Sequence, residues 1–138
     1  MSYAGDVTPG QAFEAVRDDP DAVIVDVRTR AELAYVGFPD LSAIGKQLVV
    51  AEWQLFPTGQ QNPQFLAELS AQGVRSDQPV FFLCRSGGRS RFAAMAATAA
   101  GFERAYNVRH GFEGPLDGSG HRGTHAGWKA EGLPWRQS

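Results

Sequence analysis

The clearest signal of the fold in this sequence is Pro79-Val80-Phe81-Phe82-Leu83-Cys84-Arg85-Ser86-Gly87-Gly88-Arg89-Ser90. Its first five residues form a continuous apolar run, which is typical of a strand covered on both faces of a sheet. An alanine-rich helix follows through Met95 to Ala100, and Gly101 is suited to close it. The cysteine therefore lies between the end of a central strand and the start of a helix, where open α/β sheets bind their ligands.

Two capping boxes mark the starts of helices upstream of this stretch. Thr8 with Gln11 predicts a helix that ends near Pro20, and Thr29 with Glu32 predicts a short second helix. In each pair, the hydroxyl accepts from a backbone N–H of the first turn while the longer side chain reaches back to the start of the helix. Both boxes predict helices that begin directly after turns.

Further apolar runs predict the other strands. Residues 22–27 form a β-branched run, and residues 104–108 supply a late strand. Between 36 and 59, glycines and prolines break the periodicity, so only residues 47–50 are expected to be a strand. A helix is expected from Asn62-Pro63 to Gly73, and the glycine-rich stretch after residue 110 is expected to be loop, with one last amphipathic turn. This alternation predicts an α/β fold with a mostly parallel sheet.

Composition narrows the class of protein. The chain has 138 residues, enough for one domain over residues 1–138. It is 43% hydrophobic, with 15 acidic and 13 basic groups, so its net charge of -2 gives no general attraction to nucleic acid or anionic lipid. Neither a leader-like N-terminus nor a run of about 18 apolar residues is found, so we expect a cytoplasmic protein.

Cys84 is the only cysteine, which excludes an intramolecular disulfide and a multi-cysteine metal site. A lone cysteine is either a buried apolar filler or a reactive thiol. The thiolate is the nucleophilic form, and Gly87 and Gly88 can turn successive backbone N–H groups toward an anion at the positive end of the next helix. Arg85 and Arg89 add positive charge. The alternative is a plain turn with solvated arginines, but the combination favours a site for the thiolate and an anionic substrate.

This loop resembles the active loop of the rhodanese family of sulfurtransferases, over its whole length from Cys84 to Arg89. The resemblance implies a rhodanese-like fold with helices on both faces of the sheet. It also implies that Cys84 carries sulfane sulfur as a persulfide and that no cofactor is needed. The residues implied to bind the sulfur and its anionic donor are Arg85, Ser86, Gly87, Gly88 and Arg89.

The resemblance extends over most of the chain. Asp26-Val27-Arg28 with Glu32 resembles the family's early strand-end motif, and Gly111-Phe112 resembles its late glycine-aromatic turn. The first motif is expected to brace the scaffold as an ion-paired set. The family's Gly-His-Ile-Pro-Gly-Ala segment is replaced here by residues 36–41. Trp53, Phe56 and the tail loop are expected to frame the pocket instead.

Two other chemistries fit less well. Cysteine-based phosphatases that share this fold place five residues between cysteine and arginine, whereas four separate Cys84 from Arg89. A smaller loop suits a terminal sulfur better than a tetrahedral oxyanion. The histidines lie in or beside the glycine-rich stretch without an adjacent Glu, so no metal site is expected. They are His110, His121 and His125. Arg109, His110 and Arg122 are either a basic rim for anionic donors or solvated surface charges.

Two hypotheses for function remain open on the sequence. In the first, the chain is an enzyme that takes sulfur from thiosulfate or a similar donor and passes it to a thiol, cyanide or a protein. In the second, it is a sulfur-relay or regulatory module whose persulfide serves one protein partner. With one cysteine, release cannot proceed through an internal disulfide. An inactive binding module is disfavoured because such members of the family typically lack the loop cysteine.

Overall fold

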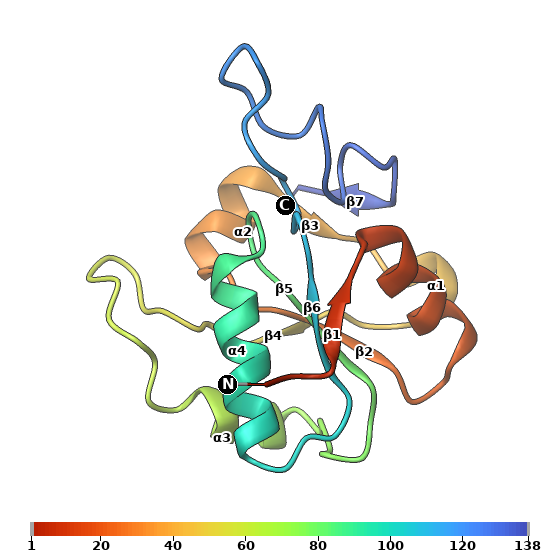
Figure 1. Cartoon of the computed structure of the whole chain (residues 1–138), viewed down its shortest axis with the longest axis vertical. Helices are drawn as coiled ribbons and strands as arrows, with labels where there is room; N and C mark the ends of the chain where they lie inside the picture. Colours follow the sequence, from red (N-terminus) through yellow and green to blue (C-terminus); the bar gives the residue numbers. More distant parts are fainter. Residues whose placement is uncertain (1, 138) are drawn as a thin grey trace.

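A computed structural model describes residues 2–137 and shows a five-stranded parallel sheet between helices (Figure 1). The strand order is β1-β6-β5-β2-β4, so the strand that leads into Cys84 is central. The sheet strands are β1 (Gly5–Val7), β2 (Val23–Asp26), β4 (Val49–Val50), β5 (Val80–Leu83) and β6 (Ala105–Val108). The helices are α1 (Pro9–Asp18), α2 (Arg30–Val36), η1 (Ser42–Ile44), α3 (Phe65–Ala71) and α4 (Gly88–Ala99).

Side chains alternate between the two faces of the sheet because successive strand residues point in opposite directions. On β5, Val80 and Phe82 pack toward α3 and α4, whereas Phe81 and Leu83 pack toward α1 and the C-terminal segment. All four β5 residues are buried. Helices therefore cover both faces, and the prediction of an α/β fold with a mostly parallel sheet is confirmed.

Local signals located several helix ends correctly. Both capping boxes form, at Thr8 with Gln11 and at Thr29 with Glu32. Gly101 has a left-handed φ of 105° after α4, as a C-terminal glycine requires. α3 begins later than predicted, because the side chain of Asn62 accepts from the N–H of Gln64 and forms a turn before the helix.

Three strands were missed. β1 is three residues long and gains its hydrogen bonds from β6, which lies far away in the sequence. β3 (Phe38–Pro39) pairs antiparallel with β7 (Trp135–Arg136), within segments that the sequence predicts to be loop or final turn. Trp128 lies in a series of turns and is fully buried. None of the helices within residues 2–137 is long and apolar enough to span a membrane.

Candidate active site

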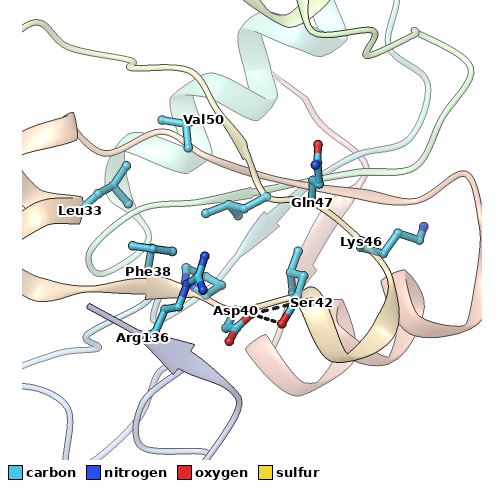
Figure 2. A pocket seen from close by; sticks show the side chains of 11 residues that line it. Leu33, Phe38, Asp40, Ser42, Lys46, Gln47, Val50 and Arg136 are labelled. Atoms are coloured by element: carbon cyan, nitrogen blue, oxygen red, sulfur yellow. Dashed lines mark hydrogen bonds between the residues drawn. The ribbon is translucent and has the colours of Figure 1, made fainter. Parts of the chain in front are cut away.

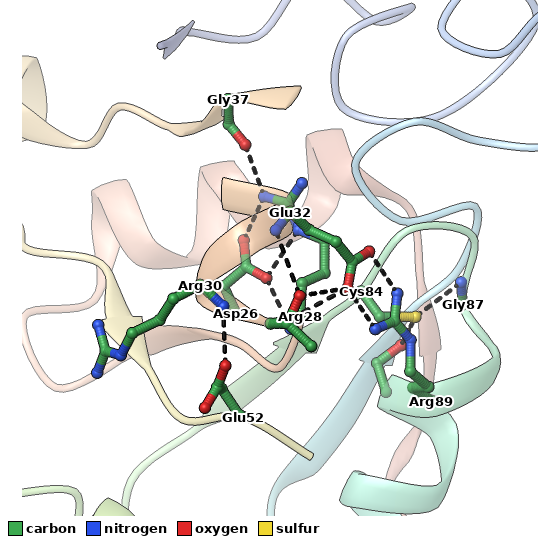
Figure 3. A network of polar contacts seen from close by, with 11 residues as sticks. Asp26, Arg28, Arg30, Glu32, Gly37, Glu52, Cys84, Gly87 and Arg89 are labelled. Atoms are coloured by element: carbon green, nitrogen blue, oxygen red, sulfur yellow. Dashed lines mark hydrogen bonds and ion pairs between the residues drawn. The ribbon is translucent and has the colours of Figure 1, made fainter. Parts of the chain in front are cut away.

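Cys84 directly follows β5 and lies beside the start of α4, with a side chain that is 1% exposed. The backbone N–H of Gly87 donates to the Cys84 sulfur at 3.1 Å, and the hydroxyl oxygen of Ser90 lies 3.2 Å from the same sulfur (Figure 3). Gly87 has a left-handed φ of 108°, which favours glycine, and it is the N-terminal cap of α4. The sulfur thus lies at the positive end of a helix of 12 residues.

A turn in the C-terminal segment, at residues 111–113, forms hydrogen bonds with the backbone of the cysteine loop. The N–H of Phe112 donates to the carbonyl of Cys84 at 2.8 Å, and the N–H of Glu113 donates to that of Arg85 at 2.9 Å. Gly111 must be glycine because a Cβ there would lie 2.3 Å from the Cys84 carbonyl oxygen. The Gly111-Phe112 turn therefore fixes the backbone of the cysteine loop from the opposite face of the sheet.

Arg89 is paired with Glu32 of α2 by two hydrogen bonds, of 2.7 and 2.8 Å. Burial by itself would raise the pKa of Glu32, but hydrogen bonds from Arg89 and from Thr29 outweigh it and lower this pKa to about 2. Glu32 in turn raises the pKa of Arg89. Arg89 thus places positive charge beside Cys84, as expected, and Glu32 balances that charge.

The early strand-end motif splits into two ion pairs, which corrects the prediction of one ion-paired set. Asp26 and Arg28 are both fully buried and form a bidentate pair at 2.9 and 2.7 Å. Arg28 also donates to the carbonyl of Gly37 and lies over the Phe112 ring at 4.3 Å. Glu32 pairs instead with Arg89, next to the sulfur. The buried pair braces the scaffold, while Glu32 belongs to the loop.

The residues predicted to bind substrate differ in their solvent exposure and in the element to which they belong. Arg85, Ser86 and Gly88 are exposed, while Gly87 and Arg89 are half-buried. Gly88 and Arg89 are the first two residues of α4 and do not belong to an open loop. In the part of the chain that the structure describes, Gly87 is the one backbone donor recorded to the sulfur.

Three residues near the sulfur were missed by sequence reasoning. Ser90 is fully buried, and it donates to the side-chain oxygen of Asn107 at 2.6 Å. Asn107 donates onward to Asp6 at 3.0 Å. Ser90 could have been predicted from the sequence, because its hydroxyl group directly follows the loop residue Arg89. Asn107 and Asp6 gave no local signal, because Asn107 reaches the site through the pairing of β6 with β5, and Asp6 through the pairing of β1 with β6.

Two cavities lie near the residues expected to frame the pocket. One, of about 410 Å³, is bordered by Glu32 and Arg89 and by the exposed rings of Tyr35 and Phe56. Trp53 does not take part, because it packs edge-to-face on Phe65 with ring centroids 5.2 Å apart. Of the two aromatic residues expected to frame the pocket, only Phe56 therefore lines this cavity beside Arg89.

The segment that replaces the family's Gly-His-Ile motif lines the other cavity, of about 470 Å³ (Figure 2). Phe38 and Asp40 lie on its wall with Arg136, and no residue from 84–90 is among its described lining residues. The side chain of Lys46, at its edge, donates to three backbone carbonyls beyond the end of α1, so this lysine has a structural role. This cavity is separate from the cysteine loop.

The three residues considered as a basic rim, Arg109, His110 and Arg122, have different surroundings. Arg122 donates to the carbonyl of Gly114 at 2.7 Å, which gives it a structural partner, and Arg109 is exposed. The backbone nitrogen of His110 would lie 3.3 Å from a Cβ at Gly87, so this turn packs against the loop. Among residues 2–137, no three His, Cys, Asp or Glu side chains are grouped so as to hold a metal ion.

These observations describe a parallel α/β protein with one cysteine, which lies at a strand end against the first turn of a helix. A family model described as the STR4 middle domain matches residues 5–138. The chain is 32% identical over 109 residues to the thiosulfate sulfurtransferase GlpE of Glaesserella parasuis, covering 79% of this chain and 83% of that protein. The chain belongs to the rhodanese-like family of sulfurtransferases.

Three further proteins are similar over most of this chain. The chain is 36% identical over 126 residues to the uncharacterized RP600 homolog of Rickettsia rickettsii, covering 91% of this chain and 92% of that one. The crystal structure of Rv0390 from M. tuberculosis matches with a TM-score of 0.91 at 56% identity, over 99% of this chain and 100% of that one. The rhodanese-like domain of Anabaena Alr3790 matches with a TM-score of 0.62 at 16% identity, over 100% and 81%, and supports the fold.

Proposed function

We propose that this chain is a sulfurtransferase that carries a sulfane sulfur as a persulfide on Cys84. The donor is thiosulfate or a similar anion, and the acceptor is a thiol, cyanide or a protein. One observation carries the proposal. The sole cysteine lies at the carboxyl end of a central strand, with the Gly87 N–H 3.1 Å from its sulfur at the start of α4. Such a donor and helix end stabilise negative charge on sulfur.

The reaction balances without any cofactor. The Cys84 thiolate attacks the outer sulfur of thiosulfate, and a new sulfur–sulfur bond forms on the cysteine. The sulfur–sulfur bond of thiosulfate breaks, and its electron pair leaves with sulfite. A thiolate or cyanide then attacks the terminal sulfur of the persulfide, which breaks the bond to Cys84 and restores the thiolate.

The burial of Cys84 is consistent with a carrier. A sulfur–sulfur bond is about 2 Å long, so a persulfide places its terminal sulfur about 2 Å beyond the buried Cys84 sulfur. Arg85 and Ser86 follow Cys84 in the loop and are exposed. Arg85 makes no side-chain hydrogen bond to another residue within 2–137, so its guanidinium is available to an anionic donor.

The ion pair of Arg89 disfavours phosphatase chemistry. A phosphate would need an arginine turned into the loop, whereas Glu32 holds both terminal nitrogens of Arg89 at 2.7 and 2.8 Å. The loop is also one residue shorter than the phosphatases of this fold require. Both features favour a small terminal sulfur over a tetrahedral anion.

Intact-mass measurement tests the proposal. The wild-type protein is incubated with thiosulfate and then with cyanide, beside Cys84→Ser as the matched control. We expect the wild type alone to gain the mass of one sulfur and to lose it to cyanide as thiocyanate. If no sulfane donor yields the adduct, the persulfide proposal is refuted and a binding role for the loop takes its place.

A second candidate function is a sulfur relay to one protein partner. It is favoured by Tyr35 and Phe56, which are 84% and 68% exposed and border the cavity beside Glu32 and Arg89. Exposed aromatic side chains next to a reactive group are typical of protein contacts. A persulfide that survives excess small thiols would support this candidate, whereas rapid release to small thiols would support the enzyme.

A further inference from the structure

A row of polar side chains leads from the Cys84 sulfur to the protein surface. Ser90 lies 3.2 Å from the sulfur and 2.6 Å from the side-chain oxygen of Asn107, whose amide nitrogen lies 3.0 Å from the Asp6 carboxylate. Cys84, Ser90 and Asn107 are at most 4% exposed, whereas Asp6 is exposed. We name Ser90, Asn107 and Asp6 the polar row.

Asp6 determines which way the Asn107 amide points. An ionised carboxylate only accepts hydrogen bonds, so the amide must present its NH₂ group to Asp6. Its oxygen therefore faces Ser90. Asp6 and Asn107 are paired directly in register on β1 and β6, so this contact follows from the sheet itself. Tyr3 also donates to Asp6, at 2.7 Å, and holds the carboxylate in place.

The orientation of Asn107 decides what Ser90 offers to the sulfur. A serine hydroxyl has one proton, and the Asn107 oxygen, which is only an acceptor, takes it across 2.6 Å. Ser90 then faces Cys84 with a lone pair, which favours a protonated thiol that donates to Ser90. When Ser90 instead donates to a thiolate, the buried Asn107 oxygen loses its partner, and such a loss is unfavourable.

We propose that Asp6 is a positioning residue that, through Asn107 and Ser90, sets the balance between thiol and thiolate at Cys84. The proposal rests on the proposed function only in taking Cys84 as the reactive group. Asp6 keeps the proton of Ser90 directed away from the sulfur, so the thiolate depends on the Gly87 N–H. The exposed Asp6 carboxylate, on the edge strand β1, therefore lowers the reactivity of Cys84.

Other charged groups act on the same sulfur and must be separated from this effect. Arg89 of α4 faces Cys84 and is itself acted on by Glu32 of α2 and Asp26 of β2. Arg85 lies on the loop. Near Asp6, Tyr3 is the hydrogen-bonding neighbour and Arg91 of α4 acts on Tyr3. None of these groups lies between Ser90 and Asn107, so variants of the polar row isolate its contribution.

The test is the pH dependence of Cys84 alkylation by iodoacetamide, followed by intact mass. In Asp6→Asn, the new amide can donate to Asn107, whose side chain then turns and donates to Ser90, and the proton of Ser90 becomes available to the sulfur. We expect alkylation at neutral pH to be about threefold to tenfold faster, the range that one hydrogen bond confers. The limiting rate at high pH should stay unchanged, whereas a merely structural change would alter the rate at every pH.

Ser90→Ala supplies the matched background. We expect Asp6→Asn to have no effect on the alkylation profile when Ser90 is absent. An equal acceleration in both backgrounds would show that loss of the carboxylate charge acts through space, and it would overturn the proposal. An unchanged profile for Asp6→Asn, or for Asp6→Ala if the first variant does not fold, would overturn it too. Alkylation needs no sulfur donor, so failure of the persulfide proposal would be seen separately.

Discussion

Replacing Glu32 with Gln isolates the charge of the Glu32–Arg89 pair. Gln at this position can still accept from the N–H of Thr29 and complete the capping box, so the start of α2 is preserved. What is lost is the negative charge opposite Arg89. The variant therefore measures how much an ion pair next to the Cys84 sulfur stabilises the fold.

The magnitude follows from the pKa of Glu32, which is lowered from 4.5 to about 2 in the folded protein. Each unit corresponds to about 1.4 kcal/mol, which gives an upper limit of about 3 kcal/mol. Because Glu32 and Arg89 are 26% and 22% exposed, solvent screens part of this. We expect Glu32→Gln to lower the free energy of unfolding by about 1–2 kcal/mol at neutral pH.

The pH dependence has a definite sign. Because the pKa of Glu32 is lower in the folded than in the unfolded protein, its contribution is complete above about pH 4.5 and is lost as the pH falls to about 2. Near pH 3, about half remains. Urea unfolding of wild type and variant at several pH values measures this, with Asp18→Asn, which removes one partner of an exposed pair with Arg17, as a control expected to show no change. A difference between wild type and Glu32→Gln that stays constant down to pH 3 would refute the reasoning.

Three further predictions concern the scaffold. Gly111→Ala should lower the melting temperature and abolish persulfide formation, because its Cβ would meet the Cys84 carbonyl at 2.3 Å; normal sulfur loading would contradict this. Asp26→Asn should destabilise the fold by about 3–5 kcal/mol in urea unfolding, since it leaves the charge of buried Arg28 unpaired; a loss below 1 kcal/mol would be inconsistent with that burial. Trp128→Phe should cost about 1–3 kcal/mol, because it removes the 2.7 Å hydrogen bond to Pro134 from a fully buried ring; an unchanged urea midpoint would exclude this role.

Local sequence patterns were enough to predict the central strand, the cysteine after it and the helix that follows. These features depend on short-range effects: an apolar run of strand length, capping by neighbouring residues, and glycines at positions of positive φ. Gly87 and Gly101 both adopt the left-handed conformation that their places in the sequence require. The same local signals located α1 and α2 through their capping boxes.

The partners that surround the Cys84 sulfur depend instead on long-range contacts. Glu32 meets Arg89 across 57 residues, and Asn107 meets Asp6 across 101, through contacts that no local pattern encodes. β1, β3 and β7 are two or three residues long, too short for their hydrophobic pattern to predict a strand, and they exist because a distant strand supplies their hydrogen bonds. The place of Cys84 was thus local information, whereas the side chains around its sulfur were brought together by the tertiary fold.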